Sequence, residues 1–156
     1  MEKKTKDKTV VFLTVAVILL TSLVLMDTYL FSTVTVRGDS MNPSLYCGDR
    51  LLVDISSRAL NEIEYKDIVI FESPDDPDQN FVKRVIATEG QEFTISEGEL
   101  IVDGENLCEE YIQCDEYRFK NYSHVSGVVP ENKVYLLGDN RNSSNDSRNF
   151  GFISTN

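Results

Sequence analysis

Two residues of this sequence could together perform nucleophilic catalysis: a serine, Ser40, and a lysine, Lys83. A serine hydroxyl attacks a carbonyl carbon efficiently only when a neighbouring base takes its proton. A lysine with an ordinary pKa of about 10.4 is protonated at neutral pH, but burial among apolar groups can lower that pKa by several units. A pair of this kind could form an acyl-enzyme if the fold brings the two side chains together.

The residues around Ser40 favour a fixed, exposed bend. Residues 33–36 are typical of a strand, and Gly38 and Pro43 lie on either side of the serine. Glycine allows close approach of the backbone, and proline restricts the preceding Asn42 to an extended conformation. Taken alone, the pattern is also that of an ordinary turn or cap, where serine beside glycine and aspartate is common.

Lys83 is the better of two candidate bases. In a strand, Phe81, Lys83 and Val85 share one face, so the lysine lies between two apolar neighbours. The alternative is an edge-strand lysine that reaches into water and discourages aggregation. The only histidine, His124, lies in the polar stretch 121–127, and we expect it to be exposed.

The densest polar cluster of the chain is residues 138–151. A calcium loop fails on spacing, because Arg141 and Ser144 stand where an oxygen ligand and a glycine are required. The runs at 133–137 and 150–153 bracket the cluster and are typical of strands. Two interpretations stay open: a flexible loop, or a rigid network of side chains that supports a site.

The three cysteines, Cys47, Cys108 and Cys114, indicate no zinc site, because none forms a Cys-x-x-Cys pair and only one histidine is present. Cys108 and Cys114 could close a short disulfide loop in an oxidising space. Unpaired thiols are the alternative.

Length and charge set broad limits. The 156 residues suffice for one small domain with one hydrophobic core. The formal net charge is −11, and because the first eight residues carry four lysines, the acidic charge belongs to the rest of the chain. Nucleic acid is not expected as a partner, because phosphate contacts need clustered Lys and Arg.

Residues 10–26 are an uncharged apolar run of nearly the shortest length that spans a bilayer. A cleavable signal peptide would end at small residues, which this run lacks, and an all-apolar core helix seldom opens a soluble domain. We therefore expect a basic cytoplasmic N-terminus over residues 1–8, a single-pass membrane anchor over residues 9–30 and an extracytoplasmic domain over residues 31–156.

Beyond residue 31, the sequence pattern is typical of short strands separated by turns. Gly48, Gly98 and Gly104 each stand in a two-residue turn signal. Runs of strand length, rich in β-branched residues, occupy residues 50–55, 67–71, 81–86, 92–95 and 99–102. The last two runs flank Glu97-Gly98 like the arms of a hairpin. The pattern predicts a mainly β domain, either closed or sandwiched, with antiparallel strands.

Several short motifs follow the apolar segment in a fixed order. They are Ser40-Met41-Asn42-Pro43, Lys83-Arg84-Val85-Ile86, Gly138-Asp139-Asn140-Arg141 and Ser144-Asn145-Asp146-Ser147-Arg148. Each motif is modest alone, but all of them in this order form a strong signal. Together they resemble the type I signal peptidases of bacteria, which are serine endopeptidases with a Ser-Lys dyad.

The resemblance implies a signal-peptidase-like catalytic domain, built as an antiparallel β-sheet or barrel and carrying one N-terminal transmembrane helix. It implies that Ser40 attacks the scissile carbonyl and that neutral Lys83 takes its proton. It also implies that Ser144 hydrogen-bonds the lysine amine. Asp146 and Arg148 would pair to hold that network in place.

Further implied roles concern the oxyanion and the substrate. The backbone N–H of Ser40 should donate to the oxyanion, and Gly38 stands where some members of the family place a second donor, a serine hydroxyl. Met41 and Pro43 are implied as substrate-binding residues. Substrates would be secretory preproteins with small residues such as Ala at the first and third positions before the cut. The resemblance implies no metal or organic cofactor, and it implies the lipid bilayer as a partner.

Two other interpretations compete with this one. A self-cleaving repressor-type Ser-Lys protease has a similar Gly-Asp-Ser-Met stretch, but it is cytoplasmic and has no anchor. An inactive, anchored β domain that binds partners without cutting is the second. The chain stops at Asn156, where members of the family usually continue for another strand. Either the sequence is truncated or the closing strand is absent.

Overall fold

A computed structural model describes residues 8, 10–22, 31–55, 63–96, 99–112 and 124–155. The described part beyond residue 31 is mainly β, and all of its strand pairs are antiparallel. A two-stranded ribbon pairs β1 (Phe31–Thr35) with β2 (Arg50–Asp54). The predicted fold class, mainly antiparallel β, is therefore confirmed.

The central sheet carries the strand on which Lys83 lies. Its order is β10-β9-β4-β3, with β3 (Ile68–Glu72), β4 (Asn80–Thr88), β9 (Lys133–Leu137) and β10 (Ile153–Ser154). A second four-stranded sheet has the order β7-β6-β5-β8, with β5 (Glu92–Ser96), β6 (Glu99–Val102), β7 (Glu105–Leu107) and β8 (Val125–Val128). The predicted hairpin around Glu97-Gly98 is the β5–β6 pair.

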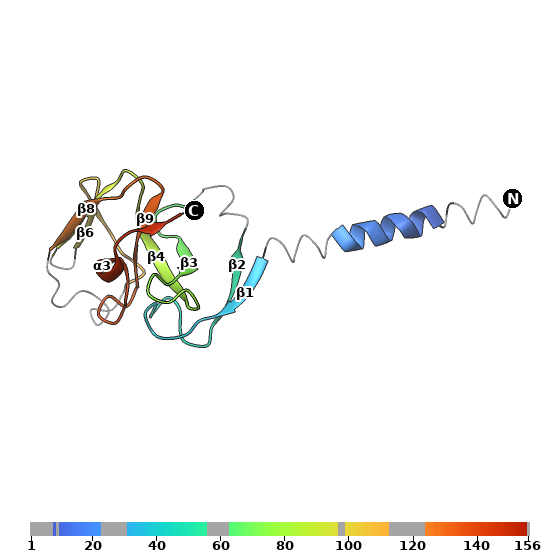
Figure 1. Cartoon of the computed structure of the whole chain (residues 1–156), viewed down its shortest axis with the longest axis horizontal. Coiled ribbons are helices and arrows are strands. Elements are labelled where there is room, and N and C mark those ends of the chain that lie inside the picture. Colours follow the sequence, from blue (N-terminus) through green and yellow to red (C-terminus); the bar gives the residue numbers. More distant parts are fainter. Residues whose placement is uncertain are drawn as a thin grey trace.

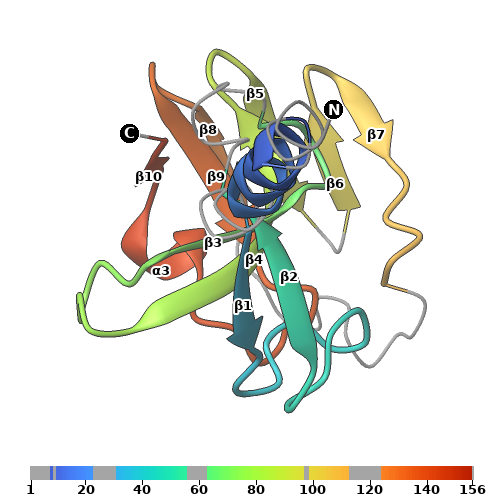
Figure 2. The same cartoon turned by 90° about the vertical axis from the view of Figure 1, so that its right-hand side faces the viewer.

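Figure 1 shows the second sheet, the central sheet and the β1–β2 ribbon one after another along the long axis, and Figure 2 shows them from one end. The main hydrophobic core lies between the two four-stranded sheets, where Ile86 and Leu137 of the central sheet meet Phe93, Ile95 and other apolar residues of the second. A smaller cluster covers the other face of the central sheet. Its buried members are Val85, Val134 and Leu136.

The prediction of a strand over residues 150–153 is wrong in its first half. Residues Ser147–Phe150 form the short helix α3, and only Ile153–Ser154 pair as β10. Asp146 caps this helix by accepting a hydrogen bond from the backbone N–H of Arg148, and Gly151, with φ of 79°, ends it. A local cap has therefore overridden the apolar pattern of the segment.

Residues 10–22 are helical, and their large apolar side chains are exposed. Figure 1 shows this helix apart from the sheets. No helix within the described residues is both long and apolar enough to cross a membrane. Residues 1–7, 9 and 23–30 lie outside the described ranges, so the anchor over residues 9–30 and its topology stay predictions.

Candidate active site

The structure brings Ser40 and Lys83 together, although they lie 43 residues apart in the chain. Lys83 Nζ is 2.8 Å from Ser40 Oγ and 2.9 Å from the carbonyl oxygen of Val82. It also lies 5.3 Å from the centroid of the Phe81 ring, on the apolar face that strand alternation predicts. The lysine is 3% exposed on an inner strand of the central sheet. The edge-strand alternative is therefore wrong.

Burial lowers the pKa of Lys83 to about 8, because the charged ammonium loses hydration there. The carboxylates of Asp146 and Asp139 raise this pKa, and the Arg148 guanidinium lowers it, but burial is the largest effect. No carboxylate forms an ion pair with the ammonium among the described residues. A substantial fraction of the amine is therefore neutral at mildly alkaline pH, as a general base requires.

Ser40 lies in a tight turn between β1 and β2. The backbone N–H of Asn42 donates to the carbonyl of Asp39 at 3.2 Å, and the Asn42-Pro43 peptide bond is cis. Gly38 has φ of 82°, which side-chain-bearing residues rarely adopt. A Cβ at this glycine would meet no atom of the described residues within 4 Å. Close backbone approach, the reason predicted for Gly38, is thus wrong, and the turn conformation is the reason.

A second loop, residues 138–141, braces this turn. Asn140 donates from its backbone N–H to the Ser40 carbonyl at 3.0 Å and from its amide to the Asp39 carbonyl at 3.1 Å. Close approach is required here, at Gly138. A Cβ on this glycine would lie 2.5 Å from the Ser40 carbonyl oxygen and would also collide with the Ser144 side chain. The Ser40 turn is therefore packed directly against this loop.

Ser144 lies beside Gly138 but not in the predicted contact. Its Oγ is buried and has no hydrogen-bond partner among the described residues. Lys83 Nζ instead bonds the hydroxyl of Ser40 and the carbonyl of Val82. The structure therefore places Ser144 next to the Ser40 turn without showing the bond to the lysine amine that the resemblance implies.

Asp146 and Arg148 form the pair that the resemblance implies. Two nitrogens of the arginine each donate to a different carboxylate oxygen of Asp146 at 2.7 Å. The same carboxylate accepts from the backbone N–H of Gly138 at 3.0 Å, and Arg148 Nη1 donates to the carbonyl of Arg141 at 2.8 Å. This pair thereby fixes both ends of the 138–141 loop.

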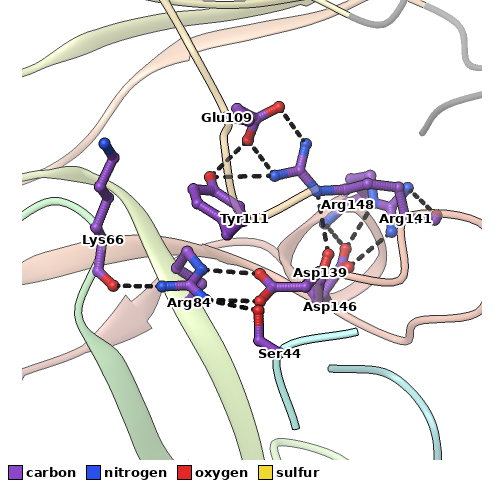
Figure 3. Close-up of polar contacts among 10 residues, drawn as sticks. Ser44, Lys66, Arg84, Glu109, Tyr111, Asp139, Arg141, Asp146 and Arg148 are labelled. Atoms are coloured by element: carbon purple, nitrogen blue, oxygen red, sulfur yellow. Dashed lines mark hydrogen bonds and ion pairs between the residues drawn. The ribbon is translucent and has the colours of Figure 1, made fainter. Parts of the chain in front are cut away.

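Two further ion pairs were not predicted from the sequence (Figure 3). Arg84 donates to both carboxylate oxygens of Asp139, at 2.8 and 2.6 Å. Arg141 donates to both oxygens of Glu109, at 2.9 Å for the Nη1–Oε2 contact. Arg84, Asp139 and Arg141 stand in recognised motifs, but their partners are distant in sequence. Glu109 lies outside every motif and carries no sequence signal.

The remaining predicted residues lie as follows. Met41 is 1% exposed and Pro43 is half-buried, so Met41 supports the turn from within, and the substrate contacts of both stay predictions. His124 is exposed, as expected.

Cys108 is exposed and Cys114 lies outside the described residues, so their disulfide is untested. No group of three or more His, Cys, Asp or Glu side chains in the described part could hold a metal ion.

A serine on a braced turn beside a buried lysine of lowered pKa is an arrangement suited to acyl transfer, and so to hydrolases of the serine type. The comparisons give the particular family. Residues 8–156 match the family described as signal peptidase, peptidase S26. The chain belongs to this family, and it is a serine protease of the signal peptidase kind.

Similarity to individual proteins supports the same family. The chain is 38% identical over 125 residues to a probable signal peptidase I-1 of Synechocystis, covering 76% of this chain but 62% of that relative. It is 30% identical to signal peptidase I S of Bacillus subtilis, covering 95% of this chain and 83% of that relative. It thus spans less than two thirds of the first relative and most of the second.

The solved structure of a signal peptidase I from Enterococcus faecalis is similar as well. The TM-score is 0.54 at 30% identity, with 60% of this chain and 91% of that chain covered. The family prediction is confirmed, and the family match decides against the repressor-type alternative.

Proposed function

We propose that this chain removes N-terminal signal peptides from exported preproteins, with Ser40 as nucleophile and Lys83 as general base. The observation that carries the proposal is the 2.8 Å contact between Lys83 Nζ and Ser40 Oγ, with the lysine 3% exposed. Both atoms are within the distance that direct proton transfer requires.

The chemistry follows from the geometry. The neutral amine of Lys83 takes the Ser40 proton as Oγ attacks the scissile carbonyl, and the resulting ammonium gives a proton to the leaving amine. A water molecule then attacks the acyl-Ser40 ester, with the same amine as base. The backbone N–H of Ser40 would donate to the oxyanion, and Gly38 holds that turn. The acceptor carbonyl of Val82 orients the amine towards Ser40.

The other predicted residues take supporting roles. Ser144 would bond the lysine amine once its hydroxyl turns toward the dyad, and its packing against Gly138 supports this role. Asp146 and Arg148 hold the loop on which the Ser40 turn rests. Met41 and Pro43 would shape the entry for a peptide with small residues at the first and third positions before the cut.

The proposed setting is the cell membrane, with residues 1–8 in the cytoplasm, residues 9–30 as the anchor and residues 31–156 outside. The basic start of the chain and its uncharged run at residues 10–26 support this topology. Protection of the N-terminal segment, but not of the β domain, from protease added outside intact cells would test it. Protease sensitivity of both parts would contradict it.

The decisive experiment is cleavage of a secretory precursor by the full chain in detergent. Wild type should release the signal peptide, and Ser40→Ala and Lys83→Ala should not. Ser126→Ala and Lys133→Ala, on β8 and β9, are matched controls that should cleave like wild type. A wild-type chain that binds the precursor without cutting it would establish the inactive-binder alternative instead.

A further inference from the structure

The segment that follows β7 reaches the active-site loop through Glu109. Arg141 is completely buried, and its guanidinium donates to both carboxylate oxygens of Glu109 and, from Nε, to the Gly138 carbonyl at 3.0 Å. A buried guanidinium needs such a counter-charge, because its desolvation is costly without one. Glu109 therefore fixes the orientation of Arg141, and with it the carbonyl end of the Gly138 peptide.

Tyr111 joins this ion pair to the second one (Figure 3). Its hydroxyl donates to Glu109 Oε1 at 2.6 Å. Its ring lies 4.1 Å from the Arg84 guanidinium carbon, within cation–π range. Arg84 in turn holds Asp139 through two hydrogen bonds. Tyr111 thus contacts Arg84, the partner of Asp139, and Glu109, the partner of Arg141.

Asp139 and Arg141 flank the residue that braces the nucleophile. Asn140, between them, donates to the carbonyls of Ser40 and Asp39. A loop held by one hydrogen-bond pair at its centre keeps freedom to shift, whereas a loop whose flanking side chains are both anchored does not. The two anchors meet at Glu109 and Tyr111, outside all of the motifs.

We propose that Glu109 and Tyr111 are positioning residues that hold the 138–141 loop, and through it Ser40, in register with Lys83. The proposal rests on the proposed function, because it assigns the two residues an effect on the chemical step. A displacement of the nucleophile by about 1 Å can cost about 100-fold in rate. Substrate binding elsewhere on the domain need not change.

The test uses the full chain in detergent, with precursor cleavage followed as kcat and KM. Glu109→Gln should lower kcat by about 100-fold. Tyr111→Phe keeps the ring over Arg84 but loses the hydroxyl's hydrogen bond to Glu109 and the longer one from Arg141, and it should lower kcat by about fivefold. KM should stay unchanged for both. The neighbouring exposed Glu110→Gln is the matched control and should match wild type. Thermal unfolding shows whether each variant is folded at the assay temperature. If Glu109→Gln is not folded there, Tyr111→Phe tests the proposal in its place.

A second readout is independent of catalysis: hydrogen exchange at the Asn140 amide, which donates to Ser40. It should speed up in Glu109→Gln and Tyr111→Phe but not in Glu110→Gln. Unchanged exchange in folded variants, or wild-type kcat despite faster exchange, would overturn the proposal. Failure of the wild type to cleave any precursor would count against the proposed function, and the exchange rates would still decide whether these residues hold the loop.

Discussion

Lys83 and Arg84 are neighbouring cations on β4 that the fold treats in opposite ways. Both are buried, with 3% and 8% of their surfaces exposed. Lys83 faces a hydroxyl, a carbonyl and an aromatic ring, and burial lowers its pKa to about 8. Burial would lower the pKa of Arg84 too, but the hydrogen bonds and charge of Asp139 outweigh it and raise that pKa.

The difference shows what each face of the strand is built for. A cation that has a bidentate carboxylate keeps its charge and fixes two segments to each other, as Arg84 fixes β4 to the 138–141 loop. A cation that is buried without a paired carboxylate can release its proton near neutral pH. One strand thereby places the proposed proton acceptor beside a permanent structural charge.

Replacing Lys83 by Met should have the largest effect on activity and an opposite effect on stability. Precursor cleavage should fall at least about 10⁴-fold, as when a member of a catalytic dyad or triad is lost. The folded-state pKa of about 8 lies below the unfolded value, so the burial cost is fully present below pH 8 and disappears as pH rises towards 10.4. Lys83→Met should therefore stabilise the protein at neutral pH by up to about 3 kcal/mol.

Cleavage rates and urea unfolding at pH 7 measure these two outcomes. The Lys133→Met variant, on the neighbouring β9, controls for loss of a lysine. Substantial cleavage by Lys83→Met would remove the lysine from the mechanism. A clear loss of stability would mean that the amine is held there as a structural cation, like Arg84.

The same substitution at Arg84 should have the opposite effect on stability. Arg84→Met leaves Asp139, which is 0% exposed, without its cation. Breaking one side of a buried pair in this way costs about 3–5 kcal/mol. Urea unfolding should show that loss, and Arg50→Met, at an exposed arginine of β2, should show almost none. Adding Asp139→Asn should recover part of the stability, and failure to do so would mean that the pair is not the cause.

These two residues also show how far the sequence alone could lead. Strand alternation placed Lys83 between Phe81 and Val85, because period-two patterning survives folding. The hairpin around Glu97-Gly98 followed from its turn signal. Arg84 and Asp139, by contrast, are 55 residues apart, and a charge pair at that separation leaves no periodic trace in the sequence.

The supporting network was predictable in part. The Asp146–Arg148 pair was implied by a motif in which its two members lie two residues apart. The partner of Arg141, Glu109, comes from a segment that no motif marks. The short helix α3 was missed, because its cap at Asp146 is a local hydrogen bond that competes with the apolar pattern of the following residues.

The pH dependence of wild-type cleavage should follow the lowered pKa of Lys83. The base acts as the neutral amine, so kcat/KM should rise about tenfold per pH unit below about 8 and then level off. Initial rates between pH 6 and 10 would define the curve. A plateau reached only near the pKa of an ordinary lysine would mean that Lys83 is hydrated in the working enzyme, and the contrast with Arg84 would then be lost.

The smallest expected effect concerns the charges that face Lys83. The Asp146 carboxylate raises the pKa of Lys83, and the Arg148 guanidinium lowers it. Asp146→Asn removes the charge that raises this pKa and leaves the one that lowers it, so the substitution favours the neutral amine. The acid limb of the kcat/KM profile should therefore move to lower pH, with the plateau reduced because the loop at Gly138 is held less well.

Asp75→Asn, at an exposed position of the loop between β3 and β4, is the matched control, because its carboxylate is not among the charges that act on Lys83. Its profile should overlay that of the wild type. A limb that moves to higher pH in Asp146→Asn would mean that the loosened loop admits water to the lysine. The pKa values of Lys83 and Arg84 would then differ because of burial by the loop more than because of nearby charges.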